Sequence, residues 1–137
     1  MTDQLLKMLN MASEAMHNAY CPYSSFAVGV CILVQNKLFS GCNVENSVYG
    51  LTQCAEANAI GNMVTVMGTQ KISEILVISN GNKLCPPCGA CRQLLQEFSA
   101  DEMLIHLAIK NEVVKTLKLS QLFPVPFRLA NEGLTHK

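Results

Sequence analysis

Residues 26–34 read Phe26-Ala27-Val28-Gly29-Val30-Cys31-Ile32-Leu33-Val34, the longest uninterrupted apolar run in the chain. The run is rich in β-branched residues and lacks a polar alternation, a pattern typical of a strand that is buried on both faces. It is far too short to span a bilayer. We therefore predict a buried strand of a globular domain here.

The segments on either side predict further elements of a mixed sheet. Apolar residues at helical spacing between Leu5 and Ala19, after a cap at Thr2 or Asp3, predict a first helix. After the buried strand, the pattern predicts a hairpin turn at 35–37, a strand at 38–42, a helix from Thr52 or Gln53 to about Met67, a strand at 75–78, a helix from about Cys88 to Phe98, and strands at 103–109 and 113–117. The tail at 123–127 contains two prolines and cannot continue a helix or a central strand. A hairpin followed by strands that alternate with helices predicts an α/β fold, a three-layer α/β/α sandwich around a five-stranded mixed sheet.

Composition sets the limits of the domain and of its partners. The chain has 137 residues, which predicts one domain over 1–137, and its 50% hydrophobic and 15% charged residues exclude disorder. A formal net charge of zero counts against a nucleic-acid or membrane-surface partner. The seven cysteines are an odd number, and no signal peptide precedes them, so we expect a reducing, cytoplasmic setting.

Two short cysteine motifs carry the predicted chemistry. Cys54-Ala55-Glu56 stands at the start of one predicted helix, and Pro87-Cys88-Gly89-Ala90-Cys91 stands at the start of the next. Cys88 and Cys91 are three residues apart and share a helix face, so they can hold one ion. The positive end of a helix lowers thiol pKa, and a thiol must lose its proton to bind zinc. Three thiolates with one open position describe a catalytic zinc site, and Glu56 can act on a water beside it as a proton acceptor and donor.

At these residues the sequence resembles the cytidine deaminases, and among them the small homotetrameric form. The motifs match the zinc deaminase signature with cysteine in place of histidine. The resemblance extends along nearly the whole chain, through Tyr23-Ser24-Ser25-Phe26, Gly41-Cys42-Asn43-Val44-Glu45-Asn46 and Cys91-Arg92-Gln93 to Phe127.

The resemblance implies a zinc-dependent hydrolase that deaminates cytidine and deoxycytidine to uridine and deoxyuridine in pyrimidine salvage. Cys54, Cys88 and Cys91 would bind one zinc ion per chain. Glu56 would shuttle protons and protonate N3 while C4 is attacked and ammonia leaves.

The resemblance also implies how the nucleoside is held. The backbone around Ala55 and the Pro87 carbonyl would contact the base edge, and Phe26 would lie against the pyrimidine ring. Asn43 and Glu45 would hydrogen-bond the ribose hydroxyls. In a homotetramer, Tyr49 and Phe127 from neighbouring subunits would complete each site.

The sequence departs from the family pattern at the residue after the glutamate. Most members carry arginine there, whereas this chain has Ala57. Zinc with three thiolates has a net negative charge, which weakens it as a Lewis acid, and the family's arginine offsets part of that charge. We expect Arg92, adjacent to Cys91, to take over part of this role. Cys85 is left without an assignment, and Cys21, Cys31 and Cys42 are expected to be core thiols.

Other functions remain open from the sequence alone. A deaminase of another cytosine-bearing small molecule would share both motifs. A nucleic-acid editing deaminase would also share them but needs a basic groove. A structural zinc module would use Cys85 or Cys42 as a fourth sulfur, and a thiol-disulfide module would use Cys85 and Cys88.

Overall fold

The apolar run forms the strand β1 (Val28–Val34) in a computed structural model that describes residues 1–129. Side chains alternate between the two faces, with Val30, Ile32 and Val34 in one core cluster and Cys31 and Leu33 in the other. The prediction of a strand buried on both faces is confirmed. The strand begins two residues later than predicted, because its pairing begins at Val28 opposite Ser79.

Five strands form one mixed sheet in the order β2-β1-β3-β4-β5. β2 (Lys37–Cys42) and β3 (Ile72–Ser79) both pair antiparallel with β1, and β4 (Ser99–Ile109) runs parallel to β3. β5 (Glu112–Lys118) pairs antiparallel with β4 and is the outermost strand on the side opposite β2. The start of β1 and the ends of β2 and β3 therefore meet at one edge of the sheet.

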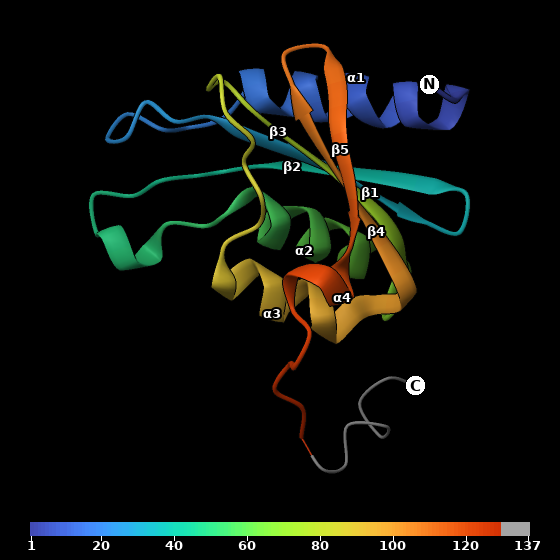
Figure 1. Ribbon diagram of the computed structural model, residues 1–137. Helices are drawn as coiled ribbons and strands as arrows, with labels where there is room; N and C mark the ends of the chain where they lie inside the picture. The colour runs from blue at the N-terminus through green and yellow to red at the C-terminus, as the bar shows by residue number, and fades with distance from the viewer. Residues whose placement is uncertain (130–137) are drawn as a thin grey trace.

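Helices cover both faces of this sheet and confirm the three-layer prediction (Figure 1). α1 (Asp3–His17) packs on one face, and its N-cap Thr2 accepts a hydrogen bond from the Leu5 amide. α2 (Ala55–Met67), α3 (Gly89–Phe98) and the short α4 (Leu119–Leu122) lie on the opposite face. The sequence pattern did not predict α4, whose single turn is too short to show a period.

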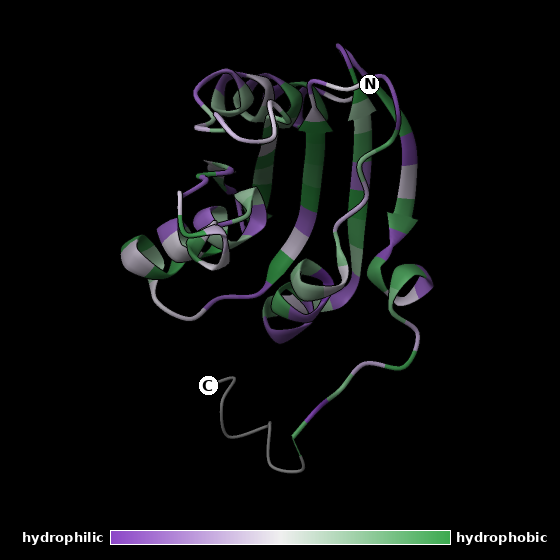
Figure 2. Cartoon of the chain, turned by 90° about the vertical axis from the view of Figure 1, so that its left-hand side faces the viewer, coloured by the Kyte–Doolittle hydropathy of each residue, from purple (hydrophilic) through white to green (hydrophobic). Residues whose placement is uncertain are grey.

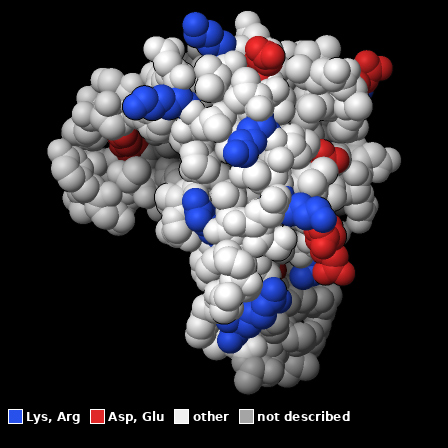
Figure 3. All heavy atoms as spheres, in the orientation of Figure 1, with Lys and Arg blue, Asp and Glu red and all other residues white. Residues whose placement is uncertain are grey.

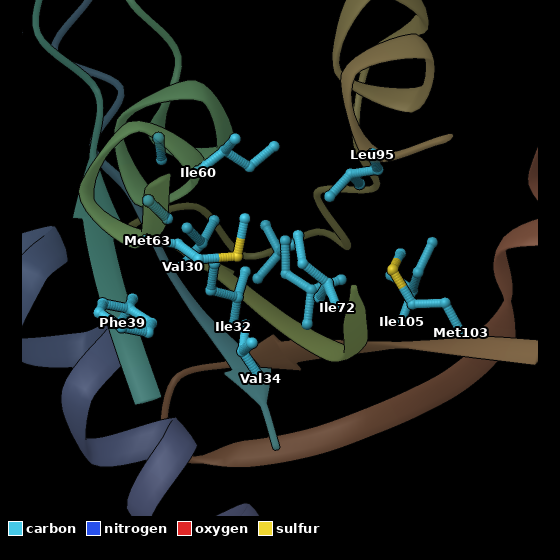
Figure 4. Packing of buried hydrophobic residues seen from close by; sticks show 14 of the residues in the cluster. Val30, Ile32, Val34, Phe39, Ile60, Met63, Ile72, Leu95, Met103 and Ile105 are labelled. Carbon is cyan, nitrogen blue, oxygen red and sulfur yellow. The ribbon is translucent and has the colours of Figure 1, made fainter. Parts of the chain in front are cut away.

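The larger core lies between the sheet and α2, α3 and α4 (Figure 4). Ile60 and Met63 of α2 and Leu95 of α3 face Ile32 and Ile105 of the sheet. On the other face, Met8, Leu9 and Ala12 of α1 pack against the sheet. In Figure 2 the inner strands carry long hydrophobic stretches, whereas β5 mixes hydrophobic and hydrophilic residues.

Two glycines allow helices to lie directly on the strands. A Cβ on Gly29 would fall 2.0 Å from the Ala12 carbonyl oxygen of α1, and one on Gly41 would fall 2.5 Å from the Ala55 carbonyl oxygen of α2. Real side chains do not approach backbone this closely. Gly41 thus fixes the first turn of α2 against the end of β2.

α2 begins at Ala55 with Cys54 as its N-cap, so the predicted start at Thr52 or Gln53 is wrong by two to three residues. The preceding residues instead form η1 (Tyr49–Leu51), and Gln53 makes an isolated bridge with Val44. Backbone bonds between Val44 and Gln53 close this loop and prevent an earlier helix start.

The surface carries charges of both signs. Lys and Arg are interspersed with Asp and Glu over the face in Figure 3, and neither sign forms a broad continuous patch there. Within residues 1–129, none of the helices combines the length and apolar character that crossing a membrane requires.

Candidate active site

The two cysteine motifs meet where α2 and α3 begin. Cys54 is the N-cap of α2 and Cys88 is the N-cap of α3, and both have extended backbone angles. Glu56 lies in the first turn of α2 and Cys91 in the first turn of α3. Because the positive ends of both helices meet here, the site favours thiolates and carboxylates.

Three donor atoms converge in this place. Ligand atoms of Cys54, Glu56 and Cys91 all lie within 4.8 Å of one another, and the two sulfurs are 2.8 Å apart. Cys91 and Glu56 are buried, and Cys54 is half-buried. Thiolate sulfur and carboxylate oxygen are ligand types that zinc takes, so this donor set fits zinc.

Cys88 lies outside the group of mutually close donors. Its residue is exposed at the N-cap of α3, three residues before Cys91 in the chain. Two of the three predicted sulfur ligands are therefore within one cluster, and the third lies at the start of the helix that carries Cys91.

The protonation equilibria of the cluster differ from those of free side chains. The Cys91 thiol donates a hydrogen bond to Cys54, and this bond lowers the pKa of Cys54 to about 7. The same bond, followed by burial, raises the pKa of Cys91. The pKa of Glu56 is raised because burial removes water from its carboxylate. The site thus combines a thiol that ionises near neutral pH with a carboxyl group that holds its proton more firmly than usual.

The remaining cysteines divide less cleanly than predicted. Cys31 is fully buried in the smaller core between the sheet and Met8, Leu9 and Ala12 of α1, which we call the α1-side core. Burial raises its pKa to about 12. Cys21 and Cys42 are only half-buried, so they are not full core residues. Cys85 packs against the larger core, and burial, followed by the negative charges of Glu56 and Cys88, raises its pKa. All seven cysteines are free.

The predicted substrate residues Phe26, Asn43 and Glu45 lie in loops at the same edge of the sheet. Asn43 is buried, and its side chain accepts from the Val28 amide at 2.9 Å and donates to the Phe26 carbonyl at 2.8 Å. The Glu45 carboxylate accepts from the amides of Tyr23 and Ser24 and from the Ser24 hydroxyl. These hydrogen bonds, chiefly the one from the hydroxyl, lower the pKa of Glu45.

Ala55 and Pro87 are both buried next to the cysteines. The Pro87 carbonyl accepts a hydrogen bond from Nε of Arg92 at 2.9 Å, and another nitrogen of the same guanidinium donates to the Leu122 carbonyl at 2.8 Å. Arg92 therefore connects the cysteine loop to the end of α4, and its hydrogen bonds go to carbonyl oxygens.

The two aromatic residues predicted to act across subunits are highly exposed. Tyr49 is 74% exposed and Phe127 is 67% exposed. Tyr49 lies on η1, in a segment that projects from the body of the chain (left in Figure 1). Its ring packs edge-on against that of Tyr23, with the two ring centroids 5.7 Å apart. The Phe127 carbonyl accepts a hydrogen bond from the side chain of Gln93 at 3.3 Å.

Several polar residues that no sequence motif marked as functional hold these loops. Asn58 of α2 donates to the Cys42 carbonyl at 2.7 Å, Ser24 bonds Glu45, and Asn80 bonds the residues on both sides of Phe26. The one available signal was position, since Asn80 directly follows a buried strand at the edge where the helices begin.

Comparison with known proteins is consistent with this geometry. A family model described as "Cytidine and deoxycytidylate deaminase zinc-binding region" matches residues 2–107, a range that contains both cysteine motifs. A cytidine deaminase of Mycobacterium tuberculosis is 40% identical over 119 residues, which cover 86% of this chain and 85% of the relative. A cytidine deaminase of Sporosarcina psychrophila is 34% identical over 123 residues, which cover 88% of this chain and 89% of the relative.

Solved structures agree with these relatives. The crystal structure of cytidine deaminase from Burkholderia pseudomallei superposes with a TM-score of 0.82 at 34% identity, covering 93% of this chain and all of that one. The five-stranded mixed sheet and its helices are therefore those of known cytidine deaminases.

Proposed function

The chain belongs to the cytidine deaminase family, and from that premise we propose that it deaminates cytidine and deoxycytidine to uridine and deoxyuridine. The observation that carries this proposal is the convergence of Cys54, Glu56 and Cys91 within 4.8 Å at the start of two helices. A buried carboxyl group beside two sulfurs provides both metal ligands and a proton carrier in one place.

We propose that Cys54, Cys88 and Cys91 hold one zinc ion per chain. The low pKa of Cys54 supports this assignment, because that thiol ionises near neutral pH. When bound, zinc would supply Lewis-acid activation of the attacking water. A structural site with four sulfurs is less well supported, because the donor group found among residues 1–129 places the Glu56 carboxyl group beside the two sulfurs.

Glu56 is proposed to carry protons between the reactants. The net reaction adds water at C4 of the pyrimidine, breaks the bond between C4 and the exocyclic nitrogen, and releases ammonia. Glu56 takes one proton from the attacking water and delivers it to N3, and the proton of the new hydroxyl at C4 passes to the exocyclic nitrogen, which leaves as ammonia. Its raised pKa suits both steps, because a carboxyl group with a pKa nearer to the working pH can accept and donate a proton.

The nucleoside is proposed to lie between the helix starts and the loops. The backbone around Ala55 and the Pro87 carbonyl contact the base edge, and Phe26, which is 42% exposed, lies against the ring. Glu45 and Asn43 form hydrogen bonds with the ribose hydroxyls. A hollow lined by Tyr23, Ser24, Glu45, Tyr49 and Thr52 supports the position of the sugar.

We further propose a cytoplasmic homotetramer in which Tyr49 and Phe127 of neighbouring subunits complete each site. The exposure of both aromatic rings supports this, because large apolar side chains at the surface favour an interface.

Arg92 is proposed to offset part of the thiolate charge that no arginine at position 57 balances, because this chain has Ala57 there. Its guanidinium donates to the carbonyl of Pro87, the residue before Cys88, and to the Leu122 carbonyl, and its position beside the cysteine loop supports this proposal.

The test measures zinc per chain and the loss of cytidine absorbance for the wild type and for Glu56→Gln. We expect about one zinc in both proteins and a turnover about 10²–10⁴-fold lower in the variant. Glu14→Gln, an exposed position on α1, is the matched control and should leave turnover unchanged. A wild type that releases no ammonia from cytidine or deoxycytidine would overturn the proposal.

A further inference from the structure

Asn80 hydrogen-bonds to both residues that flank Phe26 in the sequence, through its backbone amide and through both polar atoms of its side chain. Its backbone amide donates to the Ala27 carbonyl at 3.0 Å, and its Oδ1 accepts from the Ala27 amide at 3.1 Å. Its Nδ2 donates to the Ser25 carbonyl at 3.0 Å. One residue from the end of β3 thus holds the backbone both before and after Phe26.

The backbone of Phe26 itself is held from the other side. Its amide donates to the Ser24 hydroxyl at 3.0 Å, and its carbonyl accepts from Asn43 at 2.8 Å. The Ser24 hydroxyl in turn donates to the Glu45 carboxylate. Every backbone group from the Ser25 carbonyl to the Val28 amide is therefore hydrogen-bonded by a residue of another segment or by Ser24.

This support is needed because neither regular structure nor the core fixes Phe26. The residue precedes β1, and its ring is 42% exposed. Ser25 has a φ of 58°, in the left-handed region that serine rarely occupies. A Cβ on Gly81 would lie 3.5 Å from Cε1 of the Phe26 ring, so the loop that carries Asn80 also borders the ring.

We propose that Asn80 is a positioning residue that presents the Phe26 ring to the pyrimidine base. This inference rests on the proposed function, in which Phe26 contacts the base. By fixing the backbone on both sides of an exposed ring, Asn80 removes the conformational freedom that would otherwise be lost when substrate binds. Its loss should therefore weaken substrate binding and leave the proton transfers of Glu56 intact.

Asn80→Ala is the direct test, with Asn82→Ala as the matched control. Both asparagines are exposed in the same loop, but Asn82 borders a separate hollow near the turn between β4 and β5. We expect KM for cytidine to rise about tenfold in Asn80→Ala, with kcat and zinc content within about twofold of the wild type. Asn82→Ala should match the wild type in all three quantities. Asn80→Asp keeps the acceptor for the Ala27 amide but loses the donor to Ser25, and it serves where the alanine variant is unstable.

A double-mutant cycle with Phe26→Leu separates positioning from a general structural role. If Asn80 acts through the ring, adding Asn80→Ala to Phe26→Leu should change KM by less than about twofold. Amide hydrogen exchange gives a readout that does not depend on activity. The Ala27 amide should exchange faster in Asn80→Ala than in Asn82→Ala.

The possible failures are distinguishable. A wild type inert toward cytidine overturns the proposed function. An active wild type whose Asn80→Ala variant keeps the KM of Asn82→Ala overturns this inference alone, as does an equal rise in KM with and without the Phe26 ring.

Discussion

The candidate site has two halves that are built differently. The half with Cys54, Glu56 and Cys91 stands on the first turns of two α-helices, which the larger core fixes to the sheet. The other half, with Phe26 and Glu45, lies in loops whose polar groups bond mainly to one another.

In the proposed function, this difference separates the groups that carry out the chemistry from those that recognise the substrate. Helix starts fix the spacing of ligand atoms through backbone geometry, so the reacting groups hold their places as long as the helices stay docked. The loops depend on side-chain hydrogen bonds such as those of Asn43, and each bond can be removed singly. Changes in the helix half should therefore abolish metal binding or folding, whereas changes in the loop half should have graded effects.

The largest effect should come from a cysteine of the helix half. Cys91→Ala removes a buried thiol that we propose as a zinc ligand, and we expect zinc content and deaminase activity both to fall to background. Cys31→Ala is the matched control, because that thiol is equally buried but lies in the α1-side core. It should lose about 1 kcal/mol of stability and keep its zinc. Equal zinc loss in both variants would mean that the effect reflects folding. Metal analysis after dialysis makes the measurement.

The docking of α2 can be broken without touching a ligand. Gly41→Ala places a Cβ 2.5 Å from backbone atoms of Ala55 and Ala59, and we expect a loss of about 1–3 kcal/mol in the free energy of unfolding together with weaker zinc binding. Gly61→Ala within α2 meets open space and should stabilise the protein by about 0.5–1 kcal/mol. Urea unfolding measures both changes. A Gly41→Ala variant as stable as the wild type would show that α2 can shift freely on β2.

In the loop half, Asn43→Ala leaves the Val28 amide and the Phe26 carbonyl without their partners. We expect a loss of about 1–3 kcal/mol in the free energy of unfolding and a higher KM, because the backbone of Phe26 is no longer held. Asn36→Ala in the exposed hairpin turn is the control and should stay within about 0.5 kcal/mol. A loss of zinc from Asn43→Ala would contradict the separation of the two halves.

The smallest effect is a dependence of stability on pH. Hydrogen bonds, first of all the one from the Ser24 hydroxyl, lower the pKa of Glu45 below its ordinary value of 4.5. The folded state therefore favours the ionised carboxylate, so this stabilisation is present above pH 4.5 and is lost as the pH falls through the folded-state pKa. Between about pH 6 and pH 3, the melting temperature of the wild type should fall more than that of Glu45→Gln. Glu14→Gln on α1 should follow the wild type, and parallel curves for all three proteins would contradict the prediction.

Much of the fold could be predicted because its signals are local. The apolar run of β1, the periodicity of α1 and the cysteines at the starts of α2 and α3 each follow from a few neighbouring residues. The errors lie at element ends. The start of α2 depends on backbone bonds between Val44 and Gln53, which no pattern of apolar residues records.

From the residues alone, two cysteine motifs at predicted helix starts indicated a metal site, because thiols and a carboxylate at this spacing can share one ion. How the loops around Phe26 and Glu45 are held becomes visible only in the folded chain. The bonds of Asn80 to Ser25 and Ala27 join segments more than fifty residues apart, and those of Arg92 join α3 to the end of α4. Such contacts form only when the sheet brings distant strand ends to one edge, and for that physical reason they leave no periodic or compositional trace in the sequence.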